Sequence, residues 1–241
     1  MSFLANIFDQ VFYQPLFNAL VLIYKFIPGN DLGIAVLLLT LLIKALLYPL
    51  NLKSLKSQEV ILKLEPKIKE IKKKFKDDKE RIAKETLELY QKEKINPFSG
   101  IFLVLIQFPV LFALYGVFSK SIFTSDFSRL YSFIPDPGEI KTTFLTIDLA
   151  RPDFALAAFV GILQFFQARI QFSKKTNLST ETKTKNLPGF SEVLNKQMLY
   201  FFPAFTFFIL LKVPSAISLY LIASTAFAIL QKIYVQKTKS K

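Results

Sequence analysis

Residues 32–50 read LGIAVLLLTLLIKALLYPL, an apolar run with one charge, Lys44. A transmembrane helix needs about 20 apolar residues, so this run is long enough to cross a bilayer. A cation at the centre of such a helix costs roughly 2.5–3.5 kcal/mol and usually lines a water-filled cavity or meets a partner. The stretch therefore predicts a membrane helix that carries a polar position at mid-depth.

The alternative for Lys44 is snorkelling, in which the long side chain reaches the lipid headgroups. The basic flank begins at Lys53, nine residues further on, or about 13 Å away along a helix. Helical side chains also tilt toward the N-terminus of their helix, away from that flank. We therefore expect Lys44 to face a polar cavity.

Composition supports a membrane protein and narrows its chemistry. Of 241 residues, 52% are hydrophobic, and the formal net charge is +13; soluble domains are usually about 45–50% apolar. Such a charge favours anionic partner surfaces, including lipid headgroups and RNA. The chain has no Cys and no His, which excludes disulfides, thiolate metal sites and the commonest general base. We expect no cofactor and no metal, and the N-terminus lacks the features of a secretory signal.

The order of apolar and polar segments predicts an all-α polytopic membrane protein. We expect a five-transmembrane-helix core, a cytoplasmic helical hairpin and an N-terminal interfacial amphipathic helix. The predicted segments are 1–31 (extracytoplasmic, interfacial), 32–52 (first span), 53–97 (hairpin), 98–118 (second span), 119–152 (extracytoplasmic loop), 153–172 (third span), 173–197 (cytoplasmic loop), 198–212 (fourth span), 213–235 (fifth span) and 236–241 (basic cytoplasmic tail).

Two of these segments are unusual in length or polarity. Residues 8–28 contain Asp9, Gln14 and Asn18, so we interpret them as a helix lying at the interface, with a sixth span as the alternative. The apolar part of the fourth span, Met198 to Leu211, covers about 21 Å of a hydrocarbon core about 30 Å thick. We expect the bilayer to thin there, or polar flanks to be drawn in.

Loop charges predict the orientation. Residues 53–94 carry 14 basic and 9 acidic residues, residues 173–196 carry 5 and 2, and residues 232–241 carry 4 and none. Residues 119–152 carry 4 of each sign, and residues 1–31 carry 1 basic and 2 acidic. The positive-inside rule places the three Lys-rich segments in the cytoplasm. Five spans then leave the N-terminus outside and the C-terminus cytoplasmic; a sixth span would move the N-terminus inside.

The first cytoplasmic segment has helical periodicity. Apolar residues recur at spacings of three and four from Ile61 to Phe75, and Ala83, Leu87 and Tyr90 provide an answering stripe. Pro66 predicts a helix start or a kink. The polar run 76–79 predicts the turn of an antiparallel hairpin, and the Lys side chains on it are in general expected to be solvated.

Several polar side chains fall inside the predicted spans, where an unpaired amide costs several kcal/mol. We expect them to converge on a hydrated groove, because no buried carboxylate is available to pair Lys44. Interhelical hydrogen bonding is the alternative for any one of them. The candidate groove residues are Lys44, Thr40, Gln107, Gln164, Gln167, Tyr220 and Ser224. Gln171 and Gln231 extend the same stripes.

The absence of Asp and Glu deep in any predicted span argues against an enzyme. Proton-relay transporters and aspartyl intramembrane proteases both need buried carboxylates. A Ser–Lys hydrolase would need a serine near Lys44, and the sequence places none convincingly there. We therefore expect a protein that is not an enzyme. A channel or small-solute transporter that uses Lys44 as an anion site is one alternative, although no inverted repeat supports it.

Several stretches resemble the YidC/Oxa family of membrane-protein insertases. LEPKIKEI at 64–71 and LYQKEKINP at 89–97 resemble the family's cytoplasmic hairpin, and LIQFPV at 105–110 resembles its second core span. PSAISLY at 214–220 resembles the start of the last span. The resemblance runs from about residue 8 to the C-terminus.

The resemblance implies a five-helix core around a groove that is open to the cytosol and to lipid and holds one basic residue, usually Arg. Lys44 stands at that position, and it keeps the charge but lacks the bidentate guanidinium. Ala168 replaces the second Gln of a family pair, and Leu221 stands where relatives often have an aromatic residue. The expected partners are nascent membrane-protein substrates, the ribosome, the Sec translocon and anionic lipids, with no DNA. The large extracytoplasmic domain of Gram-negative relatives is not present in this sequence.

Overall fold

A computed structural model describes residues 3–76, 78–96, 99–172 and 197–238. It divides into two compact units, one formed by Met1–Leu46 with Phe108–Lys241 and the other by Leu47–Gln107. The predicted cytoplasmic loop at 173–197 falls, except for Gln197, outside the described residues.

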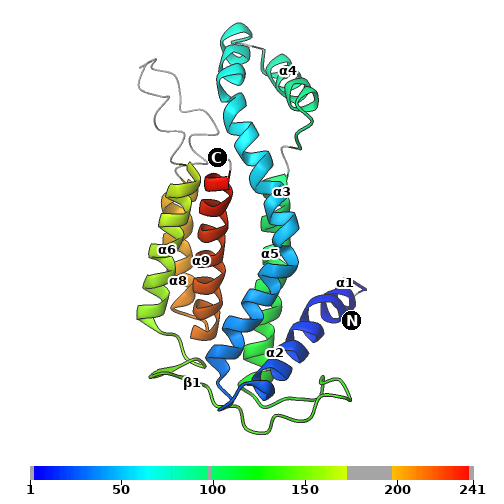
Figure 1. Cartoon of the computed structure of the whole chain (residues 1–241), viewed down its shortest axis with the longest axis vertical. Coiled ribbons are helices and arrows are strands. Elements are labelled where there is room, and N and C mark those ends of the chain that lie inside the picture. The colour runs from blue at the N-terminus through cyan, green and yellow to red at the C-terminus, as the bar shows by residue number, and fades with distance from the viewer. Residues whose placement is uncertain (1–2, 77, 97–98, 173–196, 239–241) are drawn as a thin grey trace. The chain divides into compact units, whose positions relative to one another are not determined.

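The described residues are mostly helical (Figure 1). In chain order the helices are α1 (Phe3–Phe8), η1 (Asp9–Tyr13), α2 (Gln14–Phe26), α3 (Leu32–Lys74), α4 (Lys79–Lys92), α5 (Ser99–Gly116), η2 (Val117–Ile122), α6 (Phe154–Phe172), η4 (Gln197–Phe201), α8 (Phe202–Leu210) and α9 (Ser215–Thr238). The three η elements have the wider π-helical turn.

Two helical stretches among the described residues are long and apolar enough to cross a bilayer. They are Leu32–Gln58, with 27 residues, and Ser215–Lys237, with 23 residues. Shorter apolar helices cover Ile106–Ile122, Phe154–Ile170 and Leu199–Leu210. This pattern agrees with the expectation of a mostly helical membrane protein.

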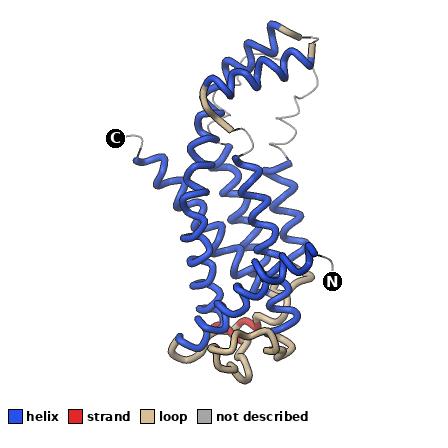
Figure 2. The backbone as a smooth tube through the Cα atoms, turned by 90° about the vertical axis from the view of Figure 1, so that its right-hand side faces the viewer, coloured by secondary structure: helices blue, strands red, loops and turns tan. Residues whose placement is uncertain are grey.

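The sequence analysis predicted no strand, but the structure has two short ones in the loop between η2 and α6 (Figure 2). Strands β1 (Thr143–Phe144) and β2 (Ile147–Asp148) pair antiparallel. Leu145, with φ of 54°, adopts the left-handed conformation at the turn between them. Strands of two residues give almost no periodic signal, and so the sequence pattern missed them.

In the first unit, α6 packs against both α8 and α9 (Figure 1). Ring contacts join Phe154 to Phe207, with centroids 5.6 Å apart, and Phe165 to Tyr200, with centroids 5.9 Å apart. Residue numbers rise along α6 as they fall along η4 and α8, so these segments are antiparallel. The backbone N–H of Ser215 donates to the carbonyl oxygen of Arg151 at 2.9 Å, which places the starts of α6 and α9 at the same end.

The N-terminal helices contact the loop that connects η2 to α6. Asn18, only 2% exposed, donates from its amide to the carbonyl oxygen of Arg129 at 3.1 Å and accepts from the backbone N–H of Tyr131 at 2.7 Å. Asp9 forms an ion pair with Arg129. The Tyr24 hydroxyl accepts from the backbone N–H of Lys141 at 3.1 Å. Both ends of the 8–28 stretch therefore contact the same loop.

The start of α3 contacts the β1–β2 turn region through a glycine. A Cβ placed on Gly33 would overlap the ring of Phe144, so only a residue without a side chain permits this close approach. The carboxylate of Asp31 accepts from the backbone N–H of Ile34 at 2.9 Å, as a residue that caps a helix N-terminus does.

In the second unit, α3 continues through Pro49 and Pro66 to Lys74 as one 43-residue helix. The sequence analysis allowed either a helix start or a kink at Pro66. Pro66 lies inside α3, so it does not begin a helix. Asp78 caps the start of α4 by accepting from the backbone N–H of Arg81 at 2.9 Å. Lys67 of α3 and Glu93, directly after α4, form an ion pair at 3.4 Å. Burial raises the pKa of Tyr90 in α4 above its ordinary value.

Candidate functional site

Lys44 lies in the first third of α3 and is only 7% exposed. Leu41 and Leu42, by contrast, are 46% and 47% exposed. The buried positions Leu39, Thr40 and Ile43 share with Lys44 the face of α3 that is turned away from the surface. The charged group thus belongs to the interior side of the helix, while bulky leucines cover its outer side.

Thr40 precedes Lys44 by one helical turn and is completely buried. Its hydroxyl donates to the carbonyl oxygen of Val36 at 2.7 Å. The hydrogen bond satisfies the hydroxyl within its own helix while leaving the oxygen able to accept another. Thr40 can therefore sit in an apolar interior and still offer a polar atom.

Four of the predicted groove residues lie on two helices that pack against each other, α6 and α9. Tyr220 and Ser224 of α9 are buried. Gln164 and Gln167 of α6 are half-buried. Because α6 and α9 start at the same end, residues a similar number of positions from their starts lie at similar depth.

Helical rise gives these depths. Gln164 lies about 15 Å and Gln167 about 20 Å from Phe154 along α6, and Ser224 lies about 14 Å from Ser215 along α9. Leu32 begins α3, at the end that contacts the β1–β2 turn region. Lys44 lies about 18 Å from Leu32 along the helix. Tyr220 lies nearer the start of its helix, about 8 Å from Ser215. Lys44, Gln164, Gln167 and Ser224, from three helices, thus lie at similar distances from the starts of their helices, about 14–20 Å.

Gln107 is half-buried in α5 and is the last residue of the second compact unit. The other six candidates belong to the first unit. The convergence of all seven on one groove remains a prediction.

Sequence analysis left several buried polar residues out of its candidate set. Thr225, Gln231 and Lys232 of α9 are buried. In the described part of the chain, the side-chain nitrogen of Gln231 and the hydroxyl of Ser218 are buried without a hydrogen-bond partner. Gln231 lies on the same stripe of α9 as Tyr220 and Ser224, and this spacing could have identified it as a candidate. Ser218 lies on the opposite side of α9, where a serine among apolar residues predicts only packing.

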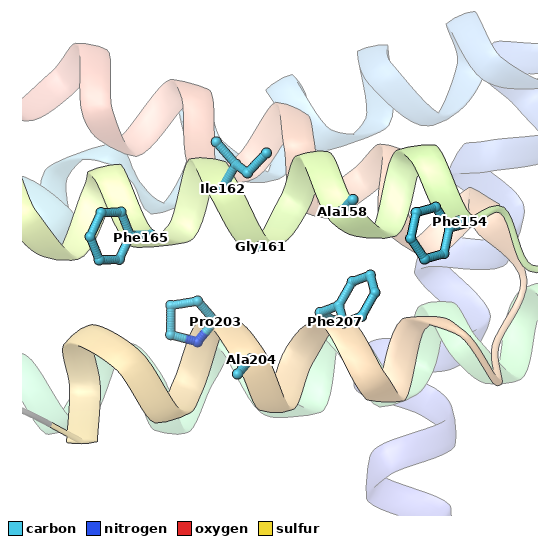
Figure 3. A pocket seen from close by; sticks show the side chains of 8 residues that line it. All are labelled: Phe154, Ala158, Gly161, Ile162, Phe165, Pro203, Ala204 and Phe207. Atoms are coloured by element: carbon cyan, nitrogen blue, oxygen red, sulfur yellow. The ribbon is translucent and has the colours of Figure 1, made fainter.

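A pocket of about 360 Å³ lies between α6 and α8 (Figure 3). Its lining is Phe154, Ala158, Gly161, Ile162 and Phe165 from α6 and Pro203, Ala204 and Phe207 from α8. None of the predicted groove residues belongs to it, and every lining side chain is apolar. It is therefore distinct from the predicted hydrated groove.

The described residues contain no group of three or more His, Cys, Asp or Glu side chains that could hold a metal ion. The polar candidates are a single amine, hydroxyls and amides, which can bind water or a polar peptide by hydrogen bonds. Their chemistry is that of a polar binding surface.

Comparisons with known proteins identify the family. The family model described as "60Kd inner membrane protein" matches residues 22–241. A relative named membrane protein insertase YidC, from Fusobacterium nucleatum, is 32% identical over 208 residues, which are 86% of this chain and 87% of the relative. The protein of that name from Clostridium tetani is 36% identical over 168 residues, which cover 67% of this chain and 70% of the relative.

A longer relative of the same name, from Anaeromyxobacter dehalogenans, is 33% identical over 208 residues. The match covers 85% of this chain but 33% of that relative, so the chain spans about a third of its length. Together with the apolar helices, these matches show a bacterial inner-membrane protein. The chain therefore belongs to the 60Kd inner membrane protein family, which is the YidC/Oxa family.

Proposed function

We propose that this chain is a membrane-protein insertase and chaperone whose five-helix core encloses a hydrated, positively charged groove. The relatives it matches are named insertases, and the family is not one of enzymes. The observation that carries the groove is the burial of Lys44 on the inner face of an otherwise apolar helix.

The depth of the polar residues supports the same proposal. Lys44, Gln164, Gln167 and Ser224 fall in one band near mid-membrane by their distances from the helix starts. Water in such a band reduces the desolvation penalty that a polar client segment meets on the way across. Gln107 and Thr40 would add hydrogen-bonding positions to the path. Tyr220 would lie at the end of the path near the start of α9.

The groove would act by lowering the free-energy barrier that a polar client segment meets on entering the membrane. The Lys44 ammonium attracts acidic or polar residues of a client segment into the wet half of the membrane. The client's apolar helix then moves sideways into lipid, and burial of its surface supplies about 25 cal/mol per Å². No covalent step is required.

Charge distribution supports the proposed orientation and partners. The Lys-rich segments at 53–97, at 173–197 and at the C-terminal tail would be cytoplasmic. There the hairpin formed by the end of α3 and α4 would receive nascent membrane-protein segments, alone or with the Sec translocon. The basic tail would contact ribosomal RNA or anionic lipid.

The test reverses the charge of Lys44 and scores membrane insertion of a single-span client with an acidic translocated tail. We expect Lys44→Glu to lower insertion at least tenfold, because a buried anion repels the tail. Lys44→Arg should retain activity, since the charge is kept. Lys120→Glu, the same change at an exposed lysine, is the matched control. Normal insertion by Lys44→Glu would contradict the charge role, and solute flux through liposomes without insertion would indicate a channel.

A further inference from the structure

The pocket between α6 and α8 has dimensions that fit a single extended chain. It extends from the Phe154–Phe207 contact to Phe165 and Pro203 (Figure 3). The twelve residues from Phe154 to Phe165 span about 16 Å along α6. The hydrocarbon core is about 30 Å thick, so the pocket is about as long as one leaflet.

The pocket is smaller than a helix. A helix with its side chains is about 10–12 Å wide, so a segment 16 Å long occupies on the order of 1,300 Å³. The pocket holds about 360 Å³. Gly161 lines the pocket without a side chain, and a Cβ there would be in ordinary van der Waals contact, 3.5 Å from the Pro203 carbonyl oxygen and 3.7 Å from the Cβ of Phe207.

Two cations lie at one end of the pocket. Arg151 is three residues before Phe154, and Lys212 is five residues after Phe207. The hydrogen bond from Ser215 N–H to the Arg151 carbonyl oxygen brings the two chain segments together. Lys212 is exposed, and in the described residues its ammonium makes no ion pair.

Two carboxylates near this end, Asp148 and Asp153, accept hydrogen bonds from neutral groups and keep their charge. Asp148 accepts from the Thr142 hydroxyl at 2.9 Å and from the Ala150 N–H at 3.0 Å. It also pairs with Arg151 at 3.4 Å, through an Arg side chain that is largely exposed. Asp153 accepts from the Leu156 N–H at 2.7 Å. Exposed ion pairs are weak, so Arg151 and Lys212 remain available to a stronger anion.

We propose that this pocket binds an anionic phospholipid, with one acyl chain between α6 and α8 and the phosphate at Arg151 and Lys212. The site lies apart from the candidate groove residues, and the proposal does not depend on insertase activity. Bound lipid would fill the space that the small residues leave between the two helices and hold their spacing.

The test uses the full chain in nanodiscs with a trace of phospholipid that carries a photoreactive acyl chain. We expect photoreactive phosphatidylglycerol to label peptides of α6 and α8 at least threefold more than phosphatidylcholine with the same label. Arg151→Ala combined with Lys212→Ala should remove that preference. Ala204→Leu, which fills the pocket, should lower labelling by both lipids at least threefold; Ala158→Leu replaces it if that variant does not fold. Ala155→Leu, on an exposed position of α6 outside the pocket, is the matched control.

Equal labelling by the two lipids, or labelling that Ala204→Leu leaves unchanged, would overturn the proposal. A dimer that protects α6 and α8 from both reagents would instead assign the pocket to a second copy. Each readout is taken without a client protein, so a failure here is separate from a failure of the insertion assay.

Discussion

At the scale of single residues, Thr40 and Leu42 provide a sharp test of the groove. Thr40 is buried, whereas Leu42 is 47% exposed on the outer side of α3. If water enters the groove, a membrane-impermeant maleimide should label Thr40→Cys and leave Leu42→Cys unlabelled, because lipid covers the outer side. The native chain has no Cys to give a background. The reverse pattern, or no labelling at either site, would mean that the Lys44 face is dry.

Tyr90 gives a pH-dependent prediction outside the membrane spans. Burial raises the pKa of its phenol because the charged form is desolvated. The contribution of the neutral Tyr90 phenol to the stability of the folded state is therefore complete below the unfolded pKa of about 10. It is lost as pH rises through the folded pKa. The difference in ultraviolet absorbance between the native protein and Tyr90→Phe should titrate above pH 10 when folded and at about 10 in denaturant. Identical midpoints would show that Tyr90 is solvated.

At the scale of elements, Asn18 connects the N-terminal helix to the loop after η2. Asn18→Ala leaves the Tyr131 N–H and the Arg129 carbonyl without this partner. We therefore expect the free energy of unfolding to fall by about 1–3 kcal/mol. Trypsin should then cleave after Arg129 faster than in the parent protein. Asn6→Ala, at an exposed position, is the control. Unchanged cleavage would mean that the loop holds its conformation without α2.

The contact between Gly33 and Phe144 predicts a compensating pair of changes. Gly33→Ala alone should lower the unfolding temperature, since overpacking costs about 1–3 kcal/mol. Phe144→Ala alone also destabilises by removing apolar contact. The double variant should be more stable than the sum of the two losses implies, because the overlap is gone. Strict additivity in thermal unfolding would argue against this contact.

These elements also indicate what sequence reasoning can reach. Lys44 stands out because one charge interrupts a long apolar run, and the two helical stretches long enough to cross a bilayer follow from hydropathy. The contacts of Asn18 with Arg129 and Tyr131 join residues more than 110 positions apart, and no local periodicity encodes them. The pocket between α6 and α8 depends on Gly161 facing Pro203, a register that only the packed helices establish. Each missed feature is a property of packing between distant segments.

At the scale of the whole molecule, the remaining question is whether residues 8–28 span the membrane. Asp9 and Tyr24, about 22 Å apart along the helices, both contact the 119–152 loop, through Arg129 and Lys141. A span would have to separate these ends across most of the hydrocarbon core. Because one loop contacts both ends, our prediction remains an interfacial helix with the N-terminus outside.

Single cysteines at exposed positions test that topology in intact cells. We expect an impermeant thiol reagent added outside to label Thr124→Cys in the loop and Gln10→Cys in η1. Lys79→Cys, in α4, should react only after the membrane is opened, because the positive-inside rule places the Lys-rich hairpin in the cytoplasm. The two outer positions should be labelled at similar rates, since both lie on one side of the bilayer. Labelling of Gln10→Cys together with Lys79→Cys, only after opening, would require a sixth span and move the N-terminus inside.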